Sequence, residues 1–207
     1  MLKHRNISIT GAATALALVI GLAAGSAGAE TLRAGIGSAD LSTADPARAT
    51  QTQDVALVSW MFNGLVRFPP GSADPAAIEP DLAESWETSD DGLVWTFHLR
   101  DGVKFHGDFG TLTADDVIYT LNRAKNPETS SFANDYAAFS SIEAIDPLTV
   151  RITLSEPVPG FLGLVANYHG GNIISQKAAE QYGDDFKNHP IGTGPFMFDK
   201  TVTQQAA

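Results

Sequence analysis

Hydrophobic and polar residues alternate most clearly between positions 86 and 100. Residues 86–88 and 93–100 fit two extended strands that flank Asp90-Asp91-Gly92, where a glycine suits the positive φ of a tight turn. Alternation in the second strand separates its side chains onto two faces, with Leu93, Trp95, Phe97 and Leu99 on one and Val94, Thr96, His98 and Arg100 on the other. The pattern predicts a β-hairpin with one buried face.

The same reasoning predicts the other elements. Strands are expected at residues 31–36, 65–68, 142–145, 149–154 and 196–198, and loops at 69–80 and 128–141. Apolar residues at helical spacing predict helices at 53–61, from Thr113 to the stop at Asn126-Pro127, at 159–166 and at 176–182. Thr113 and Asp116 have the spacing of a capping box, while Ser175 and Gly183 suit the two ends of the last helix. The order of elements predicts a mixed α and β fold with short hairpins.

The first 29 residues have the layout of a secretory signal. Lys3 and Arg5 precede a nearly uncharged stretch at residues 7–22, and small residues lead to an Ala-x-Ala site at Ala27-Gly28-Ala29. The strongly apolar part is shorter than the roughly 20 residues that a membrane-spanning helix needs. We therefore expect cleavage after Ala29, a periplasmic location, and no membrane insertion of the cleaved chain.

Composition narrows the possible partners. The 207 residues carry a formal net charge of −11 and contain no basic run, which disfavours nucleic acid as a partner. The chain has no Cys, so neither a disulfide nor a lipid on a Cys near the signal is available to it. With 43% hydrophobic residues the chain can form a packed core, and its length fits one ordinary domain or two small ones.

Catalytic and metal-binding motifs are missing from the sequence, which has no G-x-S-x-G, no H-E-x-x-H and no phosphate-binding loop. His98 and His106 lie on either side of a turn, but no third metal ligand follows at a recognisable spacing. We expect His106 to bond a loop carbonyl instead. The pair Asp115-Asp116 suits the first turn of a helix, and the pairs Asp90-Asp91 and Asp184-Asp185 suit turns or loops. No enzyme activity, cofactor or metal is expected.

Four segments together carry a resemblance to a known family. They are Pro80–Trp86, Asp91–His106, Leu112–Val117 and Pro190–Phe196, in that order. The chain resembles the extracytoplasmic solute-binding proteins of family 5, the peptide-binding components of ABC importers, from about Thr31 to Phe198. It departs from the family's usual turn at residues 107–111. The aromatic residues within these segments, Trp86, Trp95, Phe97 and Phe105, are expected to pack in the core rather than to touch a ligand.

The resemblance implies a type II periplasmic binding-protein fold, in which two lobes close on a ligand and a small extra domain packs beside the first lobe. Family members are well over twice as long as this chain, so we expect a truncated version of the fold. Residues 30–68 would form the first part of lobe 1, residues 69–190 the extra domain, and residues 191–207 a return strand towards lobe 1.

The resemblance also implies a function and a set of ligand contacts. The expected role is the substrate-binding component of an ABC importer for di- or oligopeptides, working with an inner-membrane permease, although relatives take nickel chelates, glutathione or sugar oligomers. The candidate ligand contacts are Ser38, Ala39, Asp40, Leu41, Phe132, Tyr136, Tyr168 and His169. The alternatives are a secreted interaction module without transport, a non-functional fragment and, third, a hydrolase using Asp and His.

Overall fold

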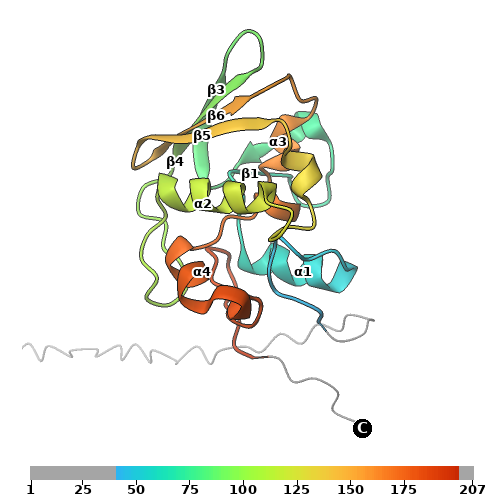
Figure 1. The fold of residues 1–207 in the computed structure, drawn as a ribbon, viewed down its shortest axis with the longest axis vertical. Coiled ribbons are helices and arrows are strands. Elements are labelled where there is room, and N and C mark those ends of the chain that lie inside the picture. The colour runs from blue at the N-terminus through green and yellow to red at the C-terminus, as the bar shows by residue number, and fades with distance from the viewer. Residues whose placement is uncertain (1–40, 201–207) are drawn as a thin grey trace, which may run out of the picture. The chain divides into compact units, whose positions relative to one another are not determined.

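Four antiparallel strands form the main sheet in residues 41–200, the part of the chain that the computed structural model describes. Their order across the sheet is β3 (Ala83–Thr88), β4 (Val94–Leu99), β6 (Thr149–Leu154) and β5 (Phe139–Asp146). Both predicted hairpins are confirmed, because β3 pairs with β4 and β5 pairs with β6, while β4 and β6 join them at the centre (Figure 1).

The alternating pattern of β4 has its expected effect on burial. Phe97 is fully buried and Leu99 nearly so, and Trp95 on the same face packs against the core. The preceding turn is closed by Asp91, whose Oδ1 accepts a hydrogen bond from the Leu93 N–H at 3.0 Å. Gly92 has φ +69°, a conformation that costs a glycine little, so the predicted use of glycine at this turn is confirmed.

Helix α2 (Ala114–Lys125) lies against β5 and β6 (Figure 1). Its predicted capping box is present, because the Thr113 N–H donates to Asp116 Oδ2 at 3.0 Å. The apolar face buries Val117 and Leu121 against the sheet, and the helix ends at Asn126 as predicted. Burial of this face joins helix and sheet into one core.

The elements that form a second hydrophobic cluster lie on the side of α2 that faces away from the main sheet (Figure 1). The cluster contains α1 (Thr52–Met61), α4 (Gln176–Tyr182) and the 3₁₀ turn η4 (Gly183–Asn188). The Ser175 side chain caps α4 by accepting from the Ala178 N–H at 3.3 Å, as predicted. Residues 174–186 therefore pack with α1, although the domain boundary expected from the sequence places them with residues 69–190.

Short elements occupy the regions that sequence patterns described least well. The loop expected at 69–80 contains η1 (Pro75–Ala77) and β2 (Glu79–Pro80), and β2 pairs with β1 (Val66–Arg67). The loop expected at 128–141 contains η2 (Ala133–Tyr136) and the start of β5. The helix expected at 159–166 is only α3 (Phe161–Leu164), because Gly160 adopts φ +74° before it and Val165 leaves the helical conformation after it.

The strand expected at 196–198 is absent from the described residues. Here the Phe196 N–H donates to the Trp60 carbonyl at 3.2 Å, so this segment lies against the end of α1 rather than beside another strand. The strand expected at 31–36 lies outside the described residues. Within residues 41–200, no helix has both the length and the apolar character needed to cross a membrane.

Candidate functional site

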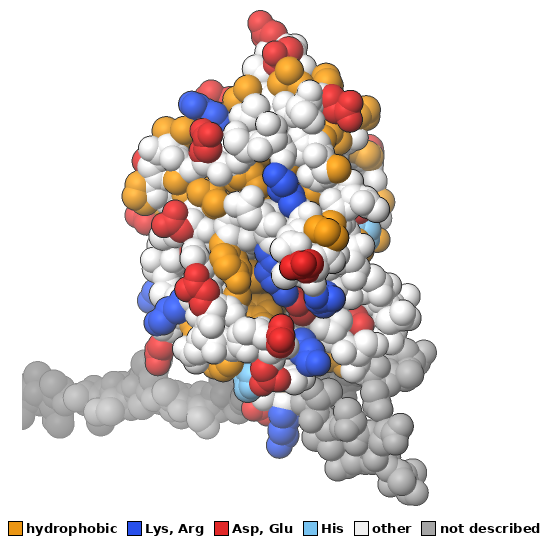
Figure 2. All heavy atoms as spheres, in the orientation of Figure 1, with side chains coloured by type: hydrophobic (Ala, Val, Ile, Leu, Met, Phe, Trp, Pro, Cys, Tyr) orange, Lys and Arg blue, Asp and Glu red, His pale blue; other side chains and the backbone are white. Residues whose placement is uncertain are grey.

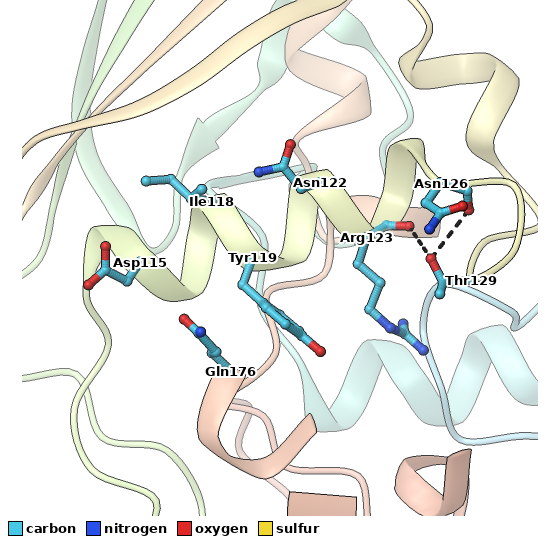
Figure 3. A pocket seen from close by; sticks show the side chains of 8 residues that line it. All are labelled: Asp115, Ile118, Tyr119, Asn122, Arg123, Asn126, Thr129 and Gln176. Carbon is cyan, nitrogen blue, oxygen red and sulfur yellow. Dashed lines mark hydrogen bonds between the residues drawn. The ribbon is translucent and has the colours of Figure 1, made fainter. Parts of the chain in front are cut away.

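A polar groove follows the outer face of α2 (Figure 3). Its volume is about 580 Å³. Most of the wall comes from side chains three or four residues apart on α2, which fall on one face of a helix. The lining residues are Asp115, Ile118, Tyr119, Asn122, Arg123, Asn126, Thr129 and Gln176. On this side of the molecule, apolar side chains lie among charged side chains of both signs (Figure 2).

The cation in this groove is already paired. Arg123 Nη1 donates to Asp45 Oδ1 at 2.8 Å, and both side chains are largely buried. Burial acts to lower the pKa of Arg123, but the hydrogen bonds and the charge of Asp45 outweigh it and raise the pKa above its ordinary value. Gln176 Nε2 likewise donates to Glu180 Oε1 at 2.7 Å. With its cation paired, the groove offers a ligand the exposed Asp115 carboxylate and the amide groups of Asn122 and Asn126.

A larger and more apolar hollow lies between η2, α3 and η3 (His169–Gly171). Its volume is about 820 Å³. Three of the residues predicted from the sequence to contact ligand, Tyr136, Tyr168 and His169, line this hollow. The other lining residues are Phe68, Ser72, Ala73, Asp135, Val158, Pro159, Gly160, Gly163 and Leu164. Tertiary structure thus brings together side chains that lie far apart in the sequence.

The His169 imidazole lies between two aromatic rings at the edge of this hollow. Its ring centroid is 4.2 Å from that of Phe132, with 7° between the planes, and 3.8 Å from that of Tyr168. Nδ1 of His169 is 3.9 Å from Asp135 Oδ2. Burial lowers the pKa of His169, and the Asp135 charge opposes this effect in part. All four residues belong to one cluster, which we call the His169 cluster: Phe132, Asp135, Tyr168 and His169.

The backbone that presents His169 is unusual. His169 has φ +50° and is the one non-glycine residue with positive φ among residues 41–200. Such strain persists where surrounding contacts fix the backbone. Here Asn172 Nδ2 donates to the His169 carbonyl at 3.0 Å. At Gly171, a Cβ atom would come within 2.3 Å of the Ala166 carbonyl oxygen, so the close packing of this turn requires glycine.

Tyr136 contributes to the hollow differently from the His169 cluster. Its side chain is fully buried, and its hydroxyl donates to the Leu164 carbonyl at 2.8 Å. Burial raises the pKa of Tyr136 well above its usual range. The hydroxyl is therefore committed to the fold, and Tyr136 serves as part of the wall between the sheet and α3.

The first predicted ligand segment is only partly described. Ser38, Ala39 and Asp40 lie outside the described residues. Leu41 is half-buried and packs against the second hydrophobic cluster, which contains α1. Sequence reasoning also missed Asp135 and Phe68. For Asp135 the available signal was its position, because it directly precedes Tyr136 in the aromatic segment that the sequence indicated. For Phe68 there was no signal of ligand contact, because the sequence showed only that it lies in a predicted strand.

His106 has the structural role expected from the sequence. Its Nε2 lies 2.7 Å from the Gly194 carbonyl, and its backbone N–H donates to the Gly192 carbonyl at 2.9 Å. These bonds attach the turn after β4 to the segment around residue 192. In residues 41–200, no group of three or more His, Asp or Glu side chains is arranged to hold a metal ion.

Comparison with known proteins identifies the family. The family model for the middle part of bacterial extracellular solute-binding proteins, family 5, matches residues 77–207. This chain belongs to that family, and its fold is the type II periplasmic binding-protein fold seen in similar solved structures.

Three relatives illustrate the similarity. The glutathione-binding protein GsiB of Salmonella paratyphi A is 34% identical over 96% of this chain and 36% of its own length. MoaA from A. tumefaciens R10, solved with mannopinic acid, is 53% identical over 79% of this chain and 33% of its own, with a TM-score of 0.77. DppA from Helicobacter pylori, solved with the peptide STSA, is 33% identical over 80% of this chain and 36% of its own, with a TM-score of 0.68. The chain thus spans about a third of the length of these relatives.

Proposed function

We propose that this protein is the solute-binding component of an ABC importer for di- or oligopeptides, acting in the periplasm and delivering its solute to an inner-membrane permease. Family membership is the observation that carries the proposal. The names of relatives support the solute class, since one binds glutathione and another was solved with a peptide. Export through residues 1–29 is part of the same proposal.

The apolar hollow supports a binding role. Solute-binding sites are concave and mostly apolar, with a few polar groups that fix orientation. The hollow has apolar walls, and the His169 cluster supplies polar groups at its edge. We propose that Phe132, Tyr168 and His169 contact the solute, while Tyr136 supports them from behind. Ser38–Leu41 would contribute from the first lobe. No reaction is proposed for these groups.

The arrangement of lobes is also a proposal. Residues 30–68 would belong to lobe 1, and the small domain would begin at residue 69. Packing of residues 174–186 with α1 supports a return to lobe 1 at about residue 174, earlier than the sequence-based boundary at 191. In this arrangement α2 separates the two hydrophobic clusters, and affinity would arise when a second lobe closes over the hollow.

A second candidate solute has one specific observation in its favour. The structure with 53% identity was solved with mannopinic acid, whereas the peptide complex above shares 33% identity. Mannopinic acid should therefore be tested as a solute together with peptides.

Isothermal titration calorimetry on the full-length protein would test the proposal. Tripeptides, glutathione and mannopinic acid would be titrated separately at the same ionic strength. We expect saturable binding of one stoichiometric equivalent of a peptide. Binding of mannopinic acid but of no peptide would select the second candidate, and absence of binding to all of them would contradict the transport role.

A further inference from the structure

The hollow beside the His169 cluster has an uneven distribution of charge. Asp135 is its one titratable acid, and no Lys or Arg is among the residues that line it. Its carboxylate is about half exposed, with side-chain accessibility of 47%. The nearest basic atom in its ion contact, His169 Nδ1, is 3.9 Å away, beyond hydrogen-bond distance. The carboxylate is therefore available to a cation from outside.

The other polar groups of the hollow do not neutralise this charge. Burial lowers the pKa of His169, which favours the neutral imidazole, and the Tyr136 hydroxyl already donates to the Leu164 carbonyl. Tyr168 is 48% exposed, and its ring is stacked on the imidazole. An exposed phenol ring attracts a cation by its face, and Tyr168 and the Asp135 carboxylate line the same hollow.

Apolar walls complete the hollow. Phe68 and Val158 are partly buried hydrophobic residues that pack on the main core, and Pro159 lies beside them. These side chains can cover the methylene stem of a long side chain, as apolar surfaces do for Lys and Arg in proteins. A single pocket thus combines a surface for a stem with an acceptor for a charged end.

Building on the proposed function, we propose that this hollow selects solutes carrying a cationic side chain, such as the Lys or Arg of a peptide. The stem would lie against Phe68 and Val158, and the charged group would lie between the Asp135 carboxylate and the Tyr168 ring. A solute carboxylate placed here would meet Asp135 without any compensating cation. The pocket would therefore discriminate by charge as well as by shape.

The expected preference is modest because Asp135 is partly exposed. An exposed ion pair together with a cation–π contact corresponds to about a tenfold preference for a cationic side chain over a neutral one of equal length. Raising the salt concentration should reduce that preference, since solvent-exposed charges are screened.

The test is calorimetry of the full-length protein with three peptides that differ in one side chain: Ala-Lys-Ala, Ala-norleucine-Ala and Ala-Glu-Ala. We expect about tenfold tighter binding of the Lys peptide than of the norleucine peptide, and the weakest binding for the Glu peptide. Asp135→Asn should remove the Lys preference, so that the Lys and norleucine peptides bind this variant with equal affinity. Asp115→Asn, which removes a carboxylate from the separate groove on α2, should preserve the preference.

The possible outcomes separate the two proposals. Equal affinity of the wild type for the Lys and norleucine peptides, or an unchanged Lys preference in Asp135→Asn, would overturn the charge selection while leaving peptide transport intact. Failure of the wild type to bind any of the three peptides would overturn the peptide function and the selection with it. Because Asp135 lies at the surface, Asp135→Asn should fold, and its circular dichroism melt would establish that directly.

Discussion

The imidazole of His169 lies parallel to the phenyl ring of Phe132, with 7° between the planes and 4.2 Å between the centroids. Phe132 directly precedes η2, and His169 begins η3. The two rings join the segment after α2 to the segment after α3 at the edge of the apolar hollow. This contact therefore ties the geometry of the proposed solute site to the packing of two short turns.

The stack can be measured by a double-mutant cycle. We expect Phe132→Leu and His169→Asn to show a coupling of about 0.5–1.5 kcal/mol in the free energy of unfolding, as other stacked aromatic pairs do. Asn is chosen at position 169 because it tolerates positive φ better than most residues. Urea denaturation of the two single variants, the double variant and the wild type provides the four values. Simple additivity of the single effects would show that the contact contributes nothing beyond burial.

Protonation of His169 should destabilise the fold. Because burial lowers the pKa of His169 in the folded state, the unfolded chain binds the proton more readily. The neutral imidazole thus contributes its full share of folding stability when the pH is above about 6.5, the ordinary pKa of histidine. That share is lost as the pH falls through the pKa of His169 in the folded state. Wild type and His169→Asn should differ in the slope of stability against pH below about 6.5, with the steeper loss in the wild type.

The other histidines are present in both proteins, so the difference between the two curves isolates position 169. An NMR titration of the imidazole should give a pKa below the ordinary value. A normal or raised value would contradict the assignment of burial as the dominant cause.

The glycines around α3 should respond oppositely to alanine. At Gly171 an added Cβ would meet backbone oxygens of Ala166 and Leu164 at 2.3 and 2.5 Å, so Gly171→Ala should cost about 3 kcal/mol or more. At Gly163, inside α3, the Cβ would meet only the Phe68 ring at 3.8 Å. Gly163→Ala should stabilise the protein by up to about 1 kcal/mol, because alanine favours the helix. Thermal melts of both variants check this contrast, and a similar effect of the two changes would refute it.

The ion pair between Asp45 and Arg123 should be costly to break from one side. Asp45→Ala leaves a largely buried guanidinium without its partner, and loss of about 3–5 kcal/mol is expected for such a change. Glu79→Ala is the matched control, since its partner Arg67 is about half exposed and such pairs contribute about 1 kcal/mol at most. Denaturation at low and high salt measures both effects. Comparable losses in the two variants would show that burial of the Arg123 pair does not govern its strength.

Local patterns along the chain predicted the hairpins and the well-capped helices. The alternation in β4, the capping box at Thr113 and the Ser175 cap of α4 all act over a few residues, so the sequence contains their full cause. The helix expected at 159–166 is shorter because Gly160 adopts a positive φ, which is also a local cause, and the Pro159-Gly160 pair was the available signal. The strand expected at 196–198 failed for the complementary reason, since its outcome depended on contact with the distant α1.

The candidate site divides in the same way. Aromatic residues near positions 132 and 168 pointed to a binding surface. Tyr168 and His169 line the hollow, whereas Phe132 is not among its lining residues and stacks on His169. Asp135 escaped sequence reasoning because an acidic residue in a polar loop has no distinguishing pattern. Tyr136 was expected to contact ligand, but its hydroxyl is bonded inside the fold, a role set by the distant Leu164 carbonyl.

The sequence by itself determined the local elements, the acidic composition and the family resemblance, because propensity, periodicity and turn chemistry act between near neighbours. Only the tertiary structure decided that His169 lies between Phe132 and Tyr168, that Asp135 opens onto an apolar hollow, and that α4 packs with α1. Those relationships join residues that are far apart along the chain, and they arise from burial of a shared core, which depends on all its members at once.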